Sequence, residues 1–583
     1  MEYSSVADDK LIENSIISSS SEQPRKGGLR TMPFIIVNEC LEKVSSYGIL
    51  PNMILYLRDD YHMPIAKATN VLYTWSAMSN ILSIFGAFLS DSYLGRFSVI
   101  FIGSFSSLLG VTILWLTAMI PVLRPSCELC NSATATQLLL LFLSFGLISI
   151  GAGCIRPCSI AFGADQLTIK ENSKNERLLD SYFNWYYTSI GASTIVALGV
   201  ITYIQENLGW KFGFGVPAAL MLISALSFTL GSPFYVKLKP SKSLLTGFVQ
   251  VAVAATKNRK LSLPVGNFEL YYQDRDSEPI VPTDSLSCLN KACIIRNPET
   301  DLNPDGSVSN PWSLCTVKQM ESLKSLLRVL PMWSTGIFMM MTQSSFSTLQ
   351  AKTMNRRLFG NFEIPAGSFT VIMVITLSII IPLYDRVAVP ILAKYTGQPR
   401  GFSSKTRIGI GLLFVIVAKA TSAVVETMRR NVAIEEGFEY QPYAVINMSA
   451  LWLVPEFVLL GIAEAFTPVG QVEFFYSHFP KSMSSFAMAL FTLELAAADV
   501  VGSVVVNVVD KVTSLGGNGS WLSTNINRGH LNYYYVLLCF LGMVNFLYYL
   551  AICWAYGPDG GENLEASAGK EDDQFDYKEL PTS

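Results

Sequence analysis

Long apolar segments, separated by shorter polar ones, follow one another along most of the chain. Most contain about 20 residues or more, the length that an α-helix needs to cross a hydrocarbon core of about 30 Å. The pattern predicts twelve spans, at residues 31–57, 70–91, 98–121, 136–160, 181–203, 213–236, 324–349, 364–386, 406–428, 446–470, 484–509 and 531–555. The hydropathy therefore predicts an all-α membrane protein.

The longest polar stretch, residues 237–323, divides the predicted spans into two groups of six. Two halves of six spans are typical of the major facilitator fold, in which substrate binds between the halves near the membrane midplane. We expect an N-terminal tail at 1–30, helical bundles at 31–236 and 324–555, a linker at 237–323 and a C-terminal tail at 556–583. The composition of the C-terminal tail, rich in glycine and acidic residues, predicts disorder.

Lysine and arginine are concentrated on one side of the predicted membrane. The residues on that side include Arg25, Lys26, Arg30, Arg96, Lys170, Lys174, Lys237, Lys239, Arg386, Lys394, Arg400 and Lys481. Cytoplasmic loops carry such an excess, so both termini and the linker are predicted to be cytoplasmic. No apolar segment precedes the first span, and we expect no cleavable signal peptide.

Composition excludes several classes of function. Half of the 583 residues are hydrophobic and 15% are charged, against about 25% charged residues in a soluble protein. The sequence has no basic patch interleaved with aromatic residues, which argues against a nucleic-acid partner. The three histidines do not have the spacing of metal ligands, which argues against a metal centre. The linker contains no phosphate-binding loop of the G-x-x-x-x-G-K-S/T type, which argues against an ATP-driven pump. We expect no enzyme activity and no cofactor; the oligomeric state, and whether Cys127 and Cys130 form a disulfide, stay open.

Three charged residues interrupt the first span, where they are costly. Glu39 and Glu42 are three residues apart and share a helix face, and Lys43 is four residues from Glu39 and can pair with it. Two ionised carboxylates repel each other, and a nearby ammonium relieves the repulsion. A cluster of this kind can exchange a proton as its partners move, so these three residues are candidates for proton coupling.

Two further charges interrupt later spans. Arg156 lies in the fourth span and Glu464 in the tenth, which belong to opposite halves, and a bridge between them would latch the cavity on one side. A proton on Glu464 or an anionic substrate would weaken that latch. Asn184 and Tyr187 in the fifth span combine polar groups with apolar bodies and are further candidates for lining the cavity.

Acidic and basic residues stand together at two corresponding helix ends. The second span ends in Asp91-Ser-Tyr-Leu-Gly95-Arg96, and the eighth ends in Asp385-Arg386. An acid beside a base could lock neighbouring helices on the cytoplasmic side and release them as the halves rock. Recurrence in both halves favours such a gate over ordinary flanking charge.

The motifs together resemble the proton-coupled oligopeptide transporter family, specifically its plant nitrate/peptide transporter branch. They are Glu39-x-x-Glu42-Lys43, Gly86 to Arg96, Gly151 to Gln166, Phe183 to Tyr187, Leu330 to Gly336, Tyr384 to Arg386 and Val469 to Gln471. The resemblance implies a twelve-span major facilitator fold and symport driven by protons. It assigns proton coupling to the first-span cluster, and it implies the functional base and acid at Arg156 and Glu464.

The chain departs from the family pattern at several positions. The family usually has arginine in the first span and often lysine in the fourth, whereas Lys43 and Arg156 show the reverse. A nitrate carrier of this branch binds nitrate through a histidine in span seven, and Met340 stands near that position. It also has a phosphorylated threonine after the second span, where this chain has Val99 with Ser98 adjacent. Dual-affinity switching is therefore not expected.

Import of nitrate or a small organic anion, through Arg156 or another donor, is the leading hypothesis for function. Di- and tripeptides or the plant hormones gibberellin, abscisic acid and jasmonate are rival substrates. A substrate sensor with little flux is an alternative of another class, although the intramembrane acids argue against a pure sensor. The sequence has no repeated pore-loop motif, which argues against a channel. The resemblance to the family suggests that the protein lies in the plasma membrane.

Overall fold

The computed structural model describes residues 27–125, 133–167, 174–238, 244–263, 270–273, 281–304, 307–343, 345–360, 362–396, 401–480, 483–515 and 519–557. Most of the two predicted tails lies outside these residues, and so do Cys127 and Cys130. The eight cysteines that are described are free thiols.

The N-terminal half contains six membrane-spanning segments. They are α2 (Met32–Leu55, continued by Tyr56–Asp60), α3 (Ile65–Leu89, continued by Ser90–Leu94), α4 (Arg96–Met119), α5 (Ala135–Leu167), α6 (Lys174–Val196, continued through Ala197–Ile201 into α7, Thr202–Asn207) and α8 (Trp210–Leu230). The short turns Leu29–Thr31 and Pro121–Leu123 are 3-10 helices. Connections between neighbouring helices are short, so consecutive helices run antiparallel.

The C-terminal half repeats this arrangement. Its helices are α11 (Val317–Met341) with α12 (Phe346–Lys352), α13 (Thr370–Leu383) with α14 (Val389–Thr396), α15 (Ser404–Glu435), α16 (Val454–His478), α17 (Ser484–Ser514) and α18 (Leu531–Tyr556). Short helical turns at Ala366–Phe369, Tyr384–Ala388 and Ala450–Leu453 extend these elements. Two small sheets pair β1 (Met354–Asn355) in parallel with β4 (Ile446–Ser449), and β2 (Arg357–Phe359) antiparallel with β3 (Phe362–Glu363).

The predicted all-α, twelve-span architecture is confirmed. Ten of the described helices are long and apolar enough to cross a membrane. The two others, α2 and α11, carry buried charges, including Glu42 and Lys324, which lower their hydropathy. The tenth span starts later than predicted, because residues Ile446–Ser449 form strand β4 and α16 begins only at Val454.

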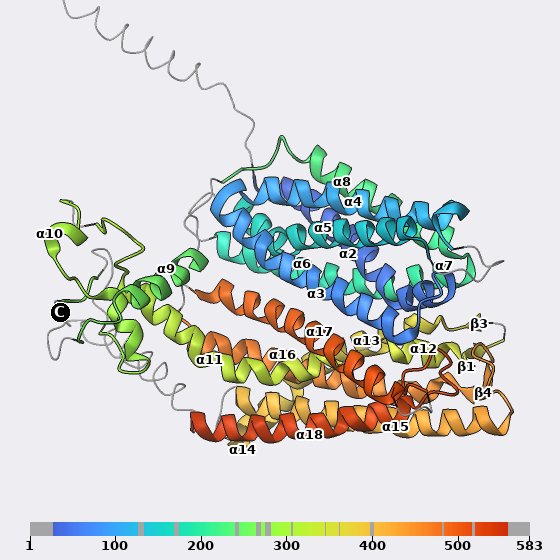
Figure 1. Ribbon diagram of the computed structural model, residues 1–583. Coiled ribbons are helices and arrows are strands. Elements are labelled where there is room, and N and C mark those ends of the chain that lie inside the picture. The colour runs from blue at the N-terminus through green and yellow to red at the C-terminus, as the bar shows by residue number, and fades with distance from the viewer. Residues whose placement is uncertain are drawn as a thin grey trace, which may run out of the picture.

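The two halves lie side by side, and the segment between them gathers at one end of the bundle (Figure 1). We call this end the linker side and the opposite end the far side. The linker contains α9 (Leu244–Lys257), a 3-10 helix (Ser287–Cys293) and α10 (Pro298–Asp301). Val251, Ala254, Cys293 and Met320 belong to an apolar cluster of its own, so the segment is more ordered than the term linker suggests.

Two helices that pack along the middle of the molecule join the halves. Asn70 of α3 donates to Asn507 of α17 at 2.8 Å, and Asn80 donates to the Asp499 carboxylate at 3.1 Å. Hydrogen bonds between polar side chains hold helices together in a bilayer, where water cannot compete. We call this contact between the halves the α3–α17 seam.

Glycines allow α3 and α5 to pack closely within the N-terminal half. A Cβ added to Gly86 would collide with the carbonyl oxygen of Gly153, and one added to Gly153 would lie 2.7 Å from the backbone carbon of Leu82. Small residues at such contacts let two backbones approach, which is the main source of helix association where no water is released.

The substitution Gly86→Ala is expected to force these two backbones apart. Overpacking of a tight contact costs about 1 to 3 kcal/mol, so the purified variant should unfold at a lower temperature than the parent protein in a detergent thermal-shift assay. Gly191→Ala is the matched control, because nothing lies within 4 Å of a Cβ at that position. Equal melting temperatures for the two variants would show that the close approach is not needed.

Candidate functional site

The three charged residues of the first span form one buried cluster. The Nζ atom of Lys43 lies 3.4 Å from Oε1 of Glu39 and 3.9 Å from Oε2 of Glu42. All three residues are at most 5% exposed. The predicted pairing of Lys43 with Glu39 is confirmed, and it follows from the spacing of four residues on one helix face.

Arg156 of α5 reaches the same cluster from the neighbouring helix. Its Nε atom lies 4.0 Å from Oε1 of Glu42, which also accepts a hydrogen bond of 2.6 Å from the Ser46 hydroxyl. The ring of Tyr47 lies 5.1 Å from the Lys43 ammonium and 5.2 Å from the guanidinium of Arg156. Two acids and two bases therefore share one site between α2 and α5.

The contacts in this four-charge cluster are incomplete. Oε2 of Glu39, Oε2 of Glu42 and Nε of Arg156 have no hydrogen-bond partner among the described residues. The Arg156 side chain is 24% exposed, whereas that of Glu42 is fully buried. A base that touches its acid only loosely and faces an accessible region can exchange that acid for an external anion.

The predicted bridge between Arg156 and Glu464 is not formed in this conformation. Arg156 contacts Glu42, and Glu464 of α16 accepts a hydrogen bond of 2.7 Å from the Gln343 side chain of α11. Each residue therefore has a partner in its own half. The predicted pairing of Arg156 with Glu464 is therefore absent from this conformation.

Asn184 and Tyr187 lie on α6 and are both exposed. Asn184 lines a shallow depression with Asp180, Ser181 and Trp185, and Tyr187 packs edge-on against Tyr186 with the ring centroids 5.9 Å apart. Neither residue has a direct contact with the four-charge cluster in the described structure. Their role as lining residues stays a prediction.

The predicted gate is present in the N-terminal half and differs in the C-terminal half. Arg96 lies 3.5 Å from Asp91 and also forms two hydrogen bonds, of 2.7 and 2.6 Å, with Asp165 of α5. Asp165 is the closer partner of Arg96, because both of its carboxylate oxygens accept hydrogen bonds from the guanidinium. These contacts tie α3, α4 and α5 together within one half.

Asp385 and Arg386 are exposed, and neither forms an ion pair in the described part of the chain, so their role as a paired gate stays a prediction. Adjacent residues on a helix project roughly 100° apart and do not face each other. The counterpart of the Arg96 contact is Arg407 of α15, which pairs with Glu473 of α16 at 2.7 Å. Its guanidinium lies 4.5 Å from the ring centroid of Tyr384.

A second set of charges, which the sequence did not reveal, joins the two halves on the far side. Glu206 of α7 lies 2.7 Å from Lys352 and 2.6 Å from Arg356, and its other oxygen accepts a hydrogen bond of 2.9 Å from the Ala366 amide. We call these contacts the far-side latch. The three charged residues stand in predicted loops or at span ends, where charge is ordinary, so no signal in the sequence distinguished them.

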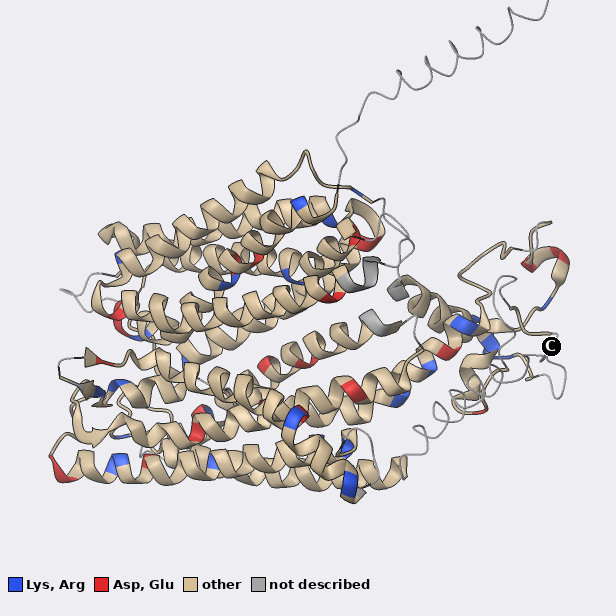
Figure 2. Ribbon diagram, turned by 180° about the vertical axis from the view of Figure 1, so that it is seen from behind, with Lys and Arg blue, Asp and Glu red and all other residues tan. Residues whose placement is uncertain are grey.

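Further polar contacts close the far side around this latch. The Asn52 side chain accepts a hydrogen bond of 3.1 Å from the Gly367 amide, and the hydroxyls of Thr202 and Ser368 are 2.6 Å apart. These contacts and those of the α3–α17 seam lie between the level of Asn80 and the far side. The ribbons of the halves also separate toward the linker end (Figures 1 and 2), so this conformation is closed on the far side.

Another acid lies within the C-terminal half. Glu494 of α17 is fully buried, and neither of its carboxylate oxygens has a hydrogen-bond partner among the described residues. It lies beside Gly336 of α11 together with Gln471 of α16. An ionised carboxylate without partners is costly in such surroundings, so Glu494 is a further candidate for carrying a proton. Its place in an apolar segment was the signal that could have identified it.

The comparisons with known proteins identify the family. A family model described as PTR2, POT family, matches residues 97–522. The chain belongs to the POT family. Members of this family are membrane transporters rather than enzymes, and this chain is an integral, multi-pass membrane transporter.

Relatives from Arabidopsis thaliana match nearly the whole chain. Protein NRT1/ PTR FAMILY 1.2 is 53% identical over 93% of this chain and 92% of its own length. Protein NRT1/ PTR FAMILY 1.1 is 52% identical over 91% and 92%. Among solved structures, an auto-inhibited POT family peptide transporter aligns with a TM-score of 0.64 at 20% identity, over 90% of this chain and 96% of the other, which supports the fold.

The departures noted in the sequence have clear positions in the structure. Met340 is buried near the C-terminal end of α11, where its sulfur lies 4.0 Å from the side-chain nitrogen of Gln343. Val99 is buried at the start of α4, and Ser98 beside it is half-buried. A thioether carries no hydrogen-bond donor, so Met340 cannot bind an anion in the way that a histidine could.

Glu206→Gln is expected to weaken the far-side latch, because it removes the charge that holds Lys352 and Arg356. The population open on the far side should rise, measured as longer distances by double electron–electron resonance between spin labels at Leu208 and Tyr440, which are exposed in opposite halves. Glu363→Gln is the matched control, since Glu363 pairs with Arg356 and Arg357 within one half. An unchanged distance distribution in Glu206→Gln would contradict a latching role.

Proposed function

We propose that this protein is a proton-coupled symporter that imports nitrate or a small organic anion by alternating access. The observation that carries the proposal is the four-charge cluster, in which a buried acid, Glu42, and an accessible base, Arg156, are 4.0 Å apart. The proton is the coupling ion, and no other cofactor is invoked. The POT family supplies the transporter class, and the cluster suggests what is carried.

The arrangement of charges couples a proton to an anion. With Glu39 and Glu42 ionised, Lys43 and Arg156 balance them, and an added anion would meet no excess positive charge. A proton on Glu42 removes one negative charge and leaves the Arg156 guanidinium free to bind an anion with two donors. Each ligand then favours binding of the other by the same factor, which is the thermodynamic basis of symport.

Alternating access then follows from the contacts between the halves. The latch of Glu206 with Lys352 and Arg356 closes the far side, while toward the linker Arg96 and Arg407 each pair within their own half. In this conformation the substrate would leave toward the linker. Tilting along the α3–α17 seam would open the far side and bring Arg156 and Glu464 closer, so their pairing belongs to the other conformation.

Import requires the linker side to be cytoplasmic, with both termini on that side. The excess of lysine and arginine there supports this orientation. We assign the protein to the plasma membrane, which is the site expected for uptake from outside the cell. Peptides and plant hormones are the alternative substrates, and a sensor with little flux is the alternative class.

Substrate-evoked current tests proton coupling. In voltage-clamped oocytes, inward current should increase as the external medium is made acidic, and Glu42→Gln should abolish transport because the proton has no acceptor. Glu299→Gln, in the exposed linker helix α10, is the control and should behave as the parent protein. Current that ignores external pH, or full transport in Glu42→Gln, would refute the symport mechanism, and surface labelling of both variants confirms equal expression.

A substrate screen tests the class of cargo. Uptake of nitrate or a small organic anion should exceed uptake of dipeptides and of the three hormones. Arg156→Ala should weaken the apparent affinity for that anion by about 10- to 100-fold, the range for loss of a charge-assisted hydrogen bond. Arg156→Lys should be intermediate, because it keeps the charge and loses the two-donor geometry. A neutral cargo with unchanged affinity in Arg156→Ala would overturn anion transport while leaving proton coupling intact.

A further inference from the structure

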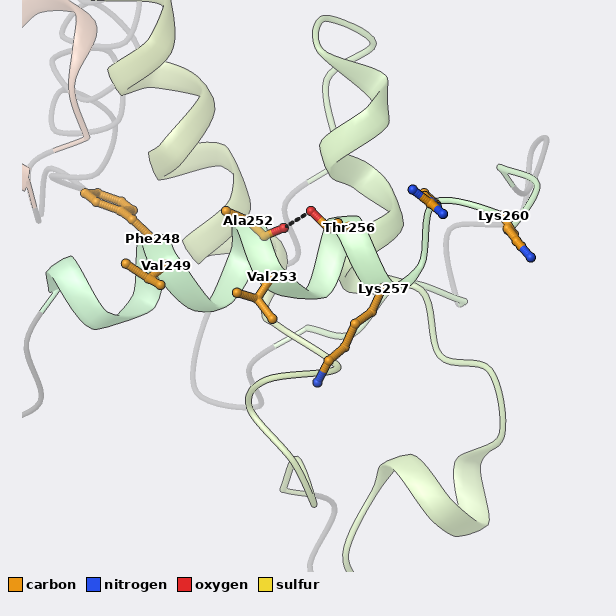
Figure 3. A pocket seen from close by; sticks show the side chains of 8 residues that line it. Phe248, Val249, Ala252, Val253, Thr256, Lys257 and Lys260 are labelled. Carbon is orange, nitrogen blue, oxygen red and sulfur yellow. Dashed lines mark hydrogen bonds between the residues drawn. The ribbon is translucent and has the colours of Figure 1, made fainter.

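The linker helix α9 presents an open groove on the linker side (Figure 3). The helix buries Val251 and Ala254 against the linker cluster and leaves another face uncovered. The groove has a volume of about 970 Å³ and is lined by Phe248, Val249, Ala252, Val253, Thr256, Lys257, Arg259 and Lys260. We call it the α9 groove.

One end of the α9 groove is apolar and the other is strongly basic. Val249 is 54% exposed, and the Thr256 hydroxyl donates its hydrogen to the Ala252 carbonyl. Lys257, Arg259 and Lys260 are all exposed, and none of them forms an ion pair in the described part of the chain. The chemistry of the groove fits a partner that combines apolar side chains with several negative charges.

The C-terminal segment of this chain has that chemistry. Residues 558–583 contain eight acidic residues and two lysines, which gives a net charge of −6. Its acidic residues are interspersed with Phe575, Tyr577 and Leu580. Its charge and its aromatic residues therefore complement the basic and apolar ends of the groove.

The segment is also attached within reach of the groove. Helix α18 ends at Tyr556, whose hydroxyl donates to the carbonyl of Arg328 on α11. Gln319 of α11 lies nine residues before Arg328, which is about 14 Å along the helix. Its side-chain nitrogen would lie 3.5 Å from a Cβ added to Gly247 of α9, so α9 contacts α11 at this point. A random coil of 26 residues has an end-to-end distance of about 28 Å, so the tether is long enough.

We propose that residues 558–583 dock in the α9 groove, with acidic side chains on Lys257, Arg259 and Lys260 and an aromatic side chain against Val249 and Ala252. Because the segment belongs to the same chain, its effective concentration at the groove is in the millimolar range, which favours it over a free partner. The rings of Phe248 and Phe486, 4.9 Å apart, connect α9 to α17. Since the segment continues from α18 of the C-terminal half, its docking on α9 would add a second connection between the linker and that half.

Photo-crosslinking of the full-length protein in nanodiscs tests this contact. A benzophenone amino acid at Ala252 should crosslink to a peptide within residues 558–583, identified by mass spectrometry. The same probe at Tyr395, which is 86% exposed on α14, is the control and should give little of this product. Nanodiscs with and without anionic lipid are compared, because an anionic membrane surface has similar charge.

Charge exchange distinguishes specific docking from chance contact. The triple substitution K257E/R259E/K260E should reduce the crosslink by about tenfold, and adding E571K/D572K/D573K should restore it. Crosslinking to lipid only, to another protein only, or to the tail with no response to charge reversal would overturn the proposal. Normal transport in the triple variant would verify that the protein is folded, and thermal shift serves that purpose if transport changes.

Discussion

The cost of burying charge in an apolar bundle governs the N-terminal half. Glu39, Glu42, Lys43 and Arg156 lie where each alone would carry a large penalty. They persist because each acid faces a base, and because α2 and α5 are held at the spacing that places them together. Removing or neutralising one member leaves another uncompensated, so any change in charge is transmitted to the packing of both helices.

The incompleteness of the same contacts gives the cluster its use. A fully satisfied buried ion pair would be a static element, whereas distances of 3.4 to 4.0 Å with unsatisfied oxygens leave room for a proton or an anion to alter the balance. The accessible member of the cluster is Arg156, whose side chain is 24% exposed.

Contacts between the halves are distributed unevenly, and this sets the conformation. The far-side latch and the α3–α17 seam supply polar bonds from the middle of the molecule outward. Toward the linker, each half is instead tied within itself, by Arg96 with Asp165 and by Arg407 with Glu473. Bonds within the halves keep each one rigid, while the few bonds between them can break, which is the requirement for rocking as two bodies.

Local properties of the chain sufficed for much of this description. Hydropathy and segment length are local, and they determined the number of spans and the two halves; motif spacing placed Lys43 beside Glu39. Pairings between distant residues depend on how each helix is rotated and on how the halves are tilted, which no local pattern encodes. Only the tertiary structure therefore decided that Arg156 meets Glu42 rather than Glu464, and that Glu206 closes the far side.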